Sequence, residues 1–383
     1  MVKQNRETEN VKMNIADNVL KNDEKIIYLL RSLYSKYGYS HFKMSQFEEY
    51  DLYVRNKDFL ISDSVITFTD TNGKLLALKP DVTFSIIKNN KYTPGSVSRY
   101  CYNENVYRVS KDTHSFKEIM QAGLECIGDI DDYAICEVLM LAAKSLKCIS
   151  DDCILTVSYL NFIYEILDDF SLSQETEQAI LKCIGEKNVH ELTKICNDNA
   201  LDVKKAESLK ELVGIYGRAE DVMPRLRDIL DDIVKPSSID EFEKIIESVS
   251  GSDFSDIIRI DFSVVSDMKY YNGVVFKGFV NSVPVGVLSG GQYDRLMQKM
   301  GHKSGAIGFA VYLDMLGRQK TQKNYDVDTV LLYDEGADLH RLRDAAEKLI
   351  LQGQSVQLHR KMPDKLKCRQ VMRFEDGEVT VVG

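Results

Sequence analysis

Residues 96–128 read SVSRYCYNENVYRVSKDTHSFKEIMQAGLECIG, and they contain two strand-forming runs separated by the polar segment KDTHS. The runs hold several valine, tyrosine and isoleucine residues, which favour a pleated, half-buried surface. Because side chains in a strand alternate between its two faces, Gln121 and Glu125 are expected on the same face of the second strand. The stretch therefore predicts a pair of strands that directs two polar side chains to one side.

Another pair of strands is expected just before this one. Residues 65–80, VITFTDTNGKLLALKP, form two strand-like runs joined at Asn72-Gly73, a dipeptide suited to a type I′ hairpin. The next segment, PDVTFSIIKNN, is predicted to be a helix that begins at Pro80, where the missing N–H of proline is tolerated. This prediction places Asp81 and Thr83 in the first helical turn.

Much of the rest of the chain is expected to be helical, with strands returning towards the end. Residues 171–250 carry apolar residues at steps of three and four in five successive segments, the last of which is SIDEFEKIIESV. Strand-like runs return in IIRIDFSVV, GVVFKGF and VPVGVLSGG, and a helix is expected from about Tyr293. GAIGFAVYLDMLGR is then predicted to be a strand followed by a helix.

This order of elements predicts an α+β protein with an antiparallel sheet and flanking helices, because it is not an alternating βαβ pattern. We expect four segments: a first core part in 1–170, an α-helical insert in 171–250, a second core part in 251–322 and a small C-terminal α/β unit in 323–383. Within the last unit, the stretch HRKMPDKLKCRQVMR, residues 359–373, is locally basic. Contact with RNA or an acidic partner is one interpretation of it, but a solvated loop and helix is expected.

Composition narrows the class of protein. The formal charge of -10 disfavours non-specific nucleic-acid binding, which needs clustered cations. The sequence holds no apolar run of 18 residues and no secretory h-region, so a cytoplasmic protein without a membrane contact is expected. The eight cysteines are scattered without a CxxC pair, which predicts neither a zinc site nor a disulfide framework.

Four local groups of residues carry the possible chemistry. They are Asp81 with Thr83, Gln121 with Glu125, the pair Tyr270-Tyr271 and the stretch SGGQYDRL. Carboxylates and an amide suit an ammonium group, and a glutamate with a tyrosine suits an imidazole, so together they suit a zwitterionic amino acid. Taken singly, each has a plainer interpretation as a helix N-terminal charge, a solvated strand residue or half-buried packing.

The order of the motifs resembles histidyl-tRNA synthetase and its paralogues. LKPDVT, VYR with FKEIMQAGLECIG, MKYYNGVVF, LSGGQYDRL and GAIGFAVYLDML follow one another as the landmarks of that family do. The resemblance implies the class II aminoacyl-tRNA synthetase-like sheet. It also implies that Asp81, Thr83 and Gln121 contact the amino group of histidine. Glu125 and Tyr271, with Tyr270 beside it, are implied to contact the imidazole.

The departures from the synthetase motifs fall on the groups that act on ATP. Synthetases read RGLDYY where this chain reads SDMKYY, so Ser266 replaces an arginine. They end the last motif in a GLERL-like sequence, where YLDML here places Met315, and Ser110 replaces a glutamate. Removing one preorganised charge donor commonly lowers a rate by roughly 10²–10³. Unless Lys269 substitutes, adenylate formation is expected to be lost, and we predict no catalytic residue.

A paralogue of this kind resembles the regulatory subunits of ATP phosphoribosyltransferase. The resemblance implies L-histidine as effector, no cofactor, and a short-form catalytic subunit as partner in a hetero-octamer. It further implies pairing through the synthetase-like dimer face, although Ser45 stands where the synthetase motif has proline. Arg108, or backbone N–H groups near the glycines of SGGQYD, are candidates to receive the histidine carboxylate.

Two other functions stay open at this point. A true histidyl-tRNA synthetase is disfavoured by Ser266, Met315 and the short C-terminal unit. A different regulatory use of the same fold, such as an RNA-sensing module, is disfavoured by the net charge.

Overall fold

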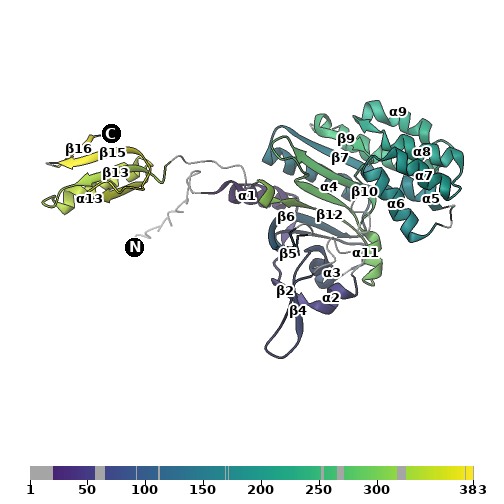
Figure 1. Ribbon diagram of the computed structural model, residues 1–383, viewed down its shortest axis with the longest axis horizontal. Helices are drawn as coiled ribbons and strands as arrows, with labels where there is room; N and C mark the ends of the chain where they lie inside the picture. Colours follow the sequence, from purple (N-terminus) through teal and green to yellow (C-terminus); the bar gives the residue numbers. More distant parts are fainter. Residues whose placement is uncertain are drawn as a thin grey trace, which may run out of the picture. The chain divides into compact units, whose positions relative to one another are not determined.

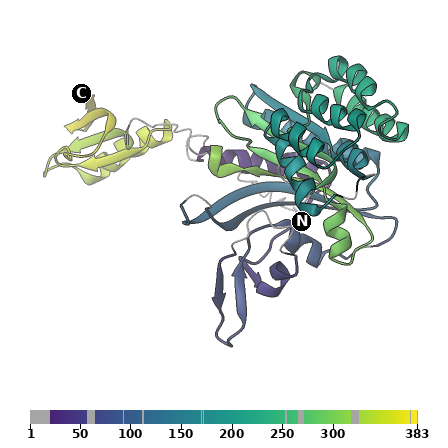
Figure 2. The same cartoon turned by 45° about the vertical axis from the view of Figure 1, so that its right-hand side comes forward.

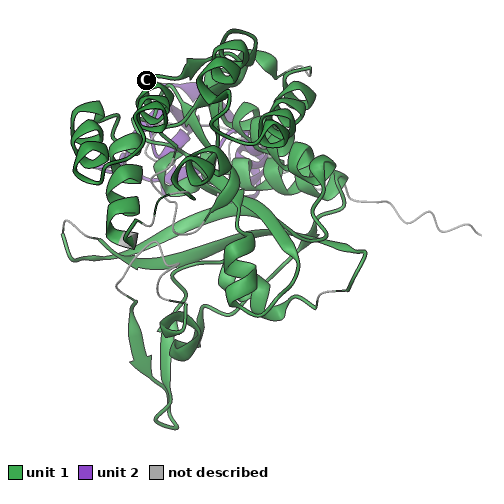
Figure 3. Cartoon of the chain, turned by 90° about the vertical axis from the view of Figure 1, so that its right-hand side faces the viewer, with its two compact units in different colours: residues 1–318 green, residues 319–383 purple. Residues whose placement is uncertain are grey.

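The computed structural model describes residues 20–56, 65–91, 93–110, 113–168, 170, 172–251, 254–264, 271–316, 325–375 and 377–382. Within the chain two compact units form, residues 1–318 and 319–383 (Figure 3). The four segment boundaries expected from the sequence remain predictions.

A nine-stranded sheet forms the centre of the first unit (Figure 1). Its strands lie in the order β1-β5-β6-β12-β11-β10-β7-β9-β8. Their bounds are β1 Ser40–His41, β5 Val97–Val109, β6 Phe116–Gly128, β7 Cys153–Tyr159, β8 Tyr216–Gly217, β9 Ile258–Asp261, β10 Asn272–Val280, β11 Leu288–Gln292 and β12 Gly305–Tyr312. All neighbours pair antiparallel except β1 with β5 and β7 with β9, so the expected antiparallel sheet is confirmed.

The two faces of this sheet are covered differently. On one face α1 (Asn22–Lys36) and α4 (Asp132–Ile149) pack on the even-numbered residues of β6, such as Leu124, in the main core. On the other face a smaller core contains Ile127, Phe84 and Tyr293. This second core joins the sheet to α2 (Tyr50–Val54), α3 (Thr83–Asn89) and α11 (Asp294–Lys299). Apolar alternation along β6 thus assigns its odd-numbered residues to the second face.

Five helices form the middle of the chain and gather at one end of the sheet (Figures 1 and 2). They are α6 Gln174–Gly185, α7 Val189–Asp198, α8 Val203–Val213, α9 Ala219–Leu230 and α10 Pro236–Ser250, preceded by α5 Leu160–Asp168. The helical pattern expected throughout residues 171–250 is interrupted at one point, because α8 ends at Val213. Tyr216 and Gly217 instead pair with β9 at the sheet edge.

A small antiparallel sheet, in the order β2-β4-β3, lies beside α2. Its strands are β2 Phe47–Glu49, β3 Thr67–Thr69 and β4 Leu75–Leu78. The turn between β3 and β4 is not type I′. Asp70 pairs with Lys74 across a three-residue loop, and Gly73 has a φ of 80° while Asn72 does not take a positive φ. Type I′ needs both central residues at positive φ, so this is a three-residue loop with a left-handed glycine.

The second unit is a four-stranded sheet with one described helix. Strands β14 (Val356–His359), β13 (Val327–Tyr333) and β15 (Cys368–Glu375) pair in parallel, and β16 (Glu378–Val381) adds to β15 antiparallel. Helix α13 (Leu339–Leu351) contributes Leu342 to the small core of this unit. The expected α/β unit is confirmed, but the basic stretch 359–373 is a loop followed by strand β15, not a loop and helix.

Candidate functional site: a buried carboxyl in a cavity on the sheet

A cavity opens on the face of the large sheet opposite α1 and α4. Its free interior is small, about 30 Å³, and reaches about 390 Å³ only when the opening to solvent is included. Its walls come from β5, β6, β11, β12 and the start of α3. The lining residues are Asp81, Val82, Thr83, Tyr102, Arg108, Gln121, Glu125, Tyr271, Ser289, Tyr293, Gly308, Phe309, Ala310 and Tyr312.

Glu125 lines this cavity and is 2% exposed. Its Oε1 accepts a hydrogen bond from the Thr83 hydroxyl at 2.7 Å, and its Oε2 accepts one from the Tyr293 hydroxyl at 2.5 Å. Burial raises the pKa of Glu125 to about 8, against the opposing effect of these two hydrogen bonds. A buried carboxyl that keeps its proton near neutral pH is suited to exchanging that proton with a ligand.

The strand opposite Glu125 must carry glycine at this point. Gly308 of β12 pairs with Glu125 across the sheet. A Cβ on Gly308 would lie 1.8 Å from Glu125 Oε2. The close approach of the two strands therefore depends on the absence of a side chain, and it fixes the position of the carboxyl.

Asp81 stands at the entrance to α3, and not inside it as expected. The helix begins at Thr83, two residues later, because Asp81 Oδ1 accepts hydrogen bonds from the backbone N–H groups of Thr83 at 2.8 Å and Phe84 at 3.4 Å. Burial raises the pKa of Asp81, with Arg108 acting in the opposite direction. Arg108 Nε donates to the Pro80 carbonyl oxygen at 3.0 Å, which holds the guanidinium beside this turn.

Six of the seven predicted site residues line this one cavity: Asp81, Thr83, Arg108, Gln121, Glu125 and Tyr271. Gln121 is 3% exposed and, like Glu125, belongs to the odd-numbered face of β6. The seventh, Tyr270, lies outside the described residues, as do Ser266 and Lys269. The role of each residue towards a ligand remains a prediction.

Three tyrosines that line the cavity were not among the predicted site residues, although one of them, Tyr293, lies in the stretch SGGQYDRL. Tyr102 reaches over Gly123 from β5, Tyr293 bonds Glu125, and Tyr312 ends β12. Two of them lie in motifs quoted from the sequence, and local patterns could have indicated them. Tyr293 stands directly before a helix, and Tyr312 follows Ala310 at a spacing of two in a strand, which places both on the same face. Tyr102 gave no such signal, since it stands in a run of strand-forming residues.

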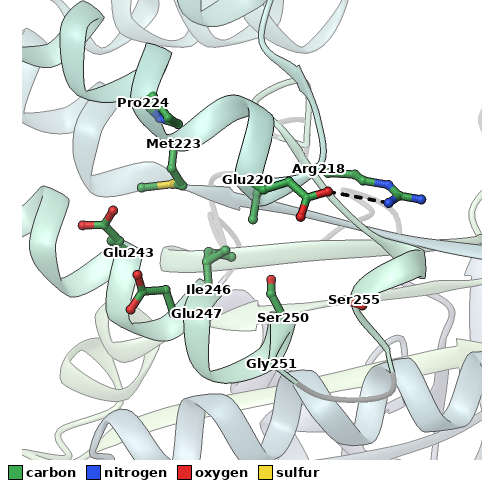
Figure 4. A pocket seen from close by; sticks show the side chains of 11 residues that line it. Arg218, Glu220, Met223, Pro224, Glu243, Ile246, Glu247, Ser250, Gly251 and Ser255 are labelled. Carbon is green, nitrogen blue, oxygen red and sulfur yellow. Dashed lines mark ion pairs between the residues drawn. The ribbon is translucent and has the colours of Figure 1, made fainter.

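A larger hollow lies in the helical part of the chain, where α9 meets α10 (Figure 4). Met223, Pro224 and Ile246 line it together with Glu220, Glu243 and Glu247. Two of its glutamates form ion pairs with arginines: Glu220 with Arg218 at 3.6 Å, and Glu243 with Arg227. None of its carboxyls is buried as Glu125 is, so the smaller cavity is the better candidate for specific chemistry.

No group of three or more histidine, cysteine, aspartate or glutamate side chains in the described ranges is arranged to hold a metal ion. All eight cysteines are unpaired. No helix of the described chain is long and apolar enough to cross a membrane.

The sheet order, the flanking helices and the cavity on the open face define a protein of the class II aminoacyl-tRNA synthetase-like fold. A family model described as histidyl-tRNA synthetase matches residues 16–316. The chain belongs to this family, as the motifs had indicated.

Two similar proteins are named as regulatory subunits of ATP phosphoribosyltransferase, and one of them also as a histidyl-tRNA synthetase. An ATP phosphoribosyltransferase regulatory subunit of a Thermoanaerobacter species is 29% identical over 307 residues, covering 78% of this chain and 80% of the relative. The crystal structure of an ATP phosphoribosyltransferase regulatory subunit/histidyl-tRNA synthetase from Bacillus halodurans superimposes with a TM-score of 0.71 at 24% identity, and the match covers 88% of both chains.

A third similar structure is that of an ATP phosphoribosyl transferase (HisG:HisZ) complex from Thermotoga maritima. It matches with a TM-score of 0.59 at 18% identity, covering 78% of this chain and 98% of that chain. At these identities the two structures establish the fold.

Proposed function

We propose that this chain is the regulatory subunit of an ATP phosphoribosyltransferase. In this proposal it binds L-histidine in the Glu125 cavity and confers activity and feedback inhibition on a short-form catalytic subunit in the cytoplasm. The observation that carries the proposal is the convergence of Asp81, Gln121, Glu125 and Arg108 on one buried cavity. The names of the relatives support the choice of partner.

The chemistry of the cavity suits each part of a histidine zwitterion. Glu125 and Tyr271 offer oxygen atoms to an imidazole, and Asp81 with the Gln121 amide offers acceptors to an ammonium group. Arg108 offers N–H donors to a carboxylate. A ligand that fills these positions leaves no buried charge without a partner, which is the condition for tight binding in a buried polar site.

The same set of residues supports a site that binds without adenylating. Of the lining residues that the structure describes, Arg108 is the one fixed cation, and Asp81 beside it balances its charge. Met315 packs against the main core and not in the cavity, so it contributes nothing to a nucleotide. Adenylate formation passes through a pentacoordinate phosphorus that is stabilised by preorganised cations, and the described lining of the cavity contains one, Arg108.

The proposed assembly is a hetero-octamer in which regulatory chains pair with each other and with catalytic subunits. Histidine would then act by binding the inhibited and active assemblies with different affinities. A ligand shifts such an equilibrium only by that difference, typically 1–3 kcal/mol.

The proposal is tested by calorimetric titration of the purified chain with L-histidine, alone and with ATP present. We expect saturable histidine binding that ATP does not change, and no release of pyrophosphate. The chain should also raise the activity of a short-form catalytic subunit and make that activity sensitive to histidine. Histidine-dependent pyrophosphate release would instead establish a synthetase, and the absence of histidine binding would overturn the proposal.

A further inference from the structure

The side chain of Tyr102 lies over Gly123 and lines the cavity. The two residues pair between β5 and β6, and a Cβ on Gly123 would lie 2.5 Å from the Tyr102 hydroxyl oxygen and 2.7 Å from its Cζ. The phenol therefore occupies the space that a side chain at position 123 would fill. Because Tyr102 is 4% exposed and packs in the second core, its hydroxyl is presented to the cavity by a buried ring.

The Tyr102 hydroxyl forms no hydrogen bond with any residue that the structure describes, unlike the hydroxyls of Thr83 and Tyr293, which both bond Glu125. A buried polar group without a partner costs free energy, so a ligand that supplies the partner gains affinity. Burial raises the pKa of Tyr102, and the nearby carboxyls of Glu125 and Asp81 act in the same direction. The hydroxyl is therefore uncharged and close to both carboxyls.

Two further acceptors in the cavity are open to a ligand. Asp81 uses Oδ1 for both of the bonds that cap α3, which leaves Oδ2. The Gln121 amide is 3% exposed and forms no hydrogen bond within the described part of the chain. Together with Tyr102, these residues present a carboxylate, an amide oxygen and a hydroxyl oxygen to one cavity.

The length of histidine places its ammonium group near Tyr102. Glu125 lies two residues from Gly123 on the same face of β6, about 7 Å along the strand. In histidine, three bonds of about 1.5 Å join the imidazole ring to the amino nitrogen. A histidine whose imidazole contacts Glu125 therefore holds its ammonium group near Gly123, where the Tyr102 hydroxyl lies.

We propose that the Tyr102 hydroxyl accepts a hydrogen bond from the ammonium group of the bound amino acid. An ammonium group has three N–H donors, and in a buried site each needs an acceptor. Tyr102 completes the set that Asp81 and Gln121 begin, while the Thr83 hydroxyl donates to Glu125 and holds that carboxyl. Tyr102 is thus a binding residue for the amino group, and the inference rests on the proposed histidine binding.

The test compares L-histidine with imidazolepropionate, which is histidine without its amino group. Calorimetric titrations use the full chain as wild type, Tyr102→Phe and the control Tyr39→Phe, which removes a buried hydroxyl that bonds Glu137 outside the cavity. We expect Tyr102→Phe to bind L-histidine roughly 10- to 100-fold more weakly than wild type, because the lost bond involves a charged group. Its affinity for imidazolepropionate, measured by competition with L-histidine where it is low, should stay within about twofold of wild type.

Thermal unfolding without ligand distinguishes a binding role of Tyr102 from a structural one. Because the hydroxyl has no partner within the described chain, Tyr102→Phe should unfold at a temperature no lower than that of wild type. Added L-histidine should raise the unfolding temperature of the variant less than that of wild type. A lower unfolding temperature of the free variant would show that the hydroxyl stabilises the fold and would contradict the inference.

The titrations can overturn the inference in three ways. An equal loss of affinity for both ligands would show that the hydroxyl acts on the imidazole or on the shape of the cavity, and not on the ammonium group. Unchanged affinity of Tyr102→Phe for L-histidine, or a similar loss in Tyr39→Phe, overturns it as well. If wild type binds no L-histidine, the proposed function itself is wrong and this inference falls with it.

Discussion

Glu125 is the residue on which the proposed recognition of imidazole depends most directly. In the Glu125→Gln variant the side chain keeps its shape, and an amide can still hydrogen-bond the hydroxyls of Thr83 and Tyr293. A hydrogen bond to a charged group contributes about 1.5–3 kcal/mol, so we expect histidine to bind roughly 10- to 100-fold more weakly. Calorimetry on the two proteins measures the difference. Equal affinities would mean that the imidazole lies elsewhere.

The raised pKa of Glu125 predicts how histidine binding depends on pH. Between about pH 6.5, the pKa of free imidazole, and about pH 8, the carboxyl holds a proton and the imidazole does not. The complex also holds one proton between them, so affinity should be nearly constant there. Below pH 6.5 binding must release a proton and above pH 8 it must take one up. Affinity should therefore fall on both sides, by up to tenfold per pH unit.

Glu125→Gln provides the control for this profile. Without the carboxyl, the decline above pH 8 that belongs to Glu125 should disappear. The ammonium group of free histidine also loses its proton in the alkaline range, and that part of the decline is common to both proteins. A decline above pH 8 that is equally steep in wild type and Glu125→Gln would contradict the assignment.

At the scale of an element, the entry of α3 combines a structural and a binding role in Asp81. The side chain caps the helix by accepting from the N–H groups of Thr83 and Phe84, and asparagine can make the same bonds. We expect Asp81→Asn to keep the free energy of unfolding within about 0.5 kcal/mol and to weaken histidine binding strongly. Asp81→Ala should in addition lose about 1 kcal/mol of stability. Chemical denaturation and calorimetry together test this, and unchanged binding in Asp81→Asn would remove Asp81 from the site.

The strands and helices around the cavity show which local features could be predicted from the sequence. The shared orientation of Gln121 and Glu125 was predictable, because residues four positions apart in a strand point to the same face of the sheet. The start of α3 was misplaced because capping by Asp81 depends on side-chain geometry, and proline with aspartate satisfies the pattern of a helix start equally well. The turn at Gly73 was misassigned because loop length follows from strand register, which the dipeptide does not contain.

The bond from Tyr293 to Glu125 joins residues 168 positions apart in the chain. No local pattern reports such a contact. The cavity could be predicted as a set of motifs, therefore, while its inner hydrogen bonds needed the packing of β11 and β12 against β6.

At the scale of the whole molecule, every residue of the cavity belongs to the unit formed by residues 1–318. The second unit, 319–383, has its own small core around Leu331, Leu342 and Phe374. A chain shortened to residues 1–318 should therefore bind histidine within about threefold of the full chain. A larger loss in a protein that unfolds cooperatively would show that the second unit contributes to the site.

Coupling between the two subunits can be tested from either side, because allosteric linkage is reciprocal. If histidine bound at Glu125 weakens binding of phosphoribosyl pyrophosphate by the catalytic subunit, that substrate must weaken histidine binding by the same factor. Coupling of 1–3 kcal/mol corresponds to about 5- to 150-fold. Titration of the assembled complex with histidine, with and without phosphoribosyl pyrophosphate, measures one side, and titration with the substrate measures the other. Inhibition of the assembled enzyme by histidine without any shift in either affinity would mean that histidine acts on turnover alone and not on substrate binding, since reciprocity constrains affinities and not rates.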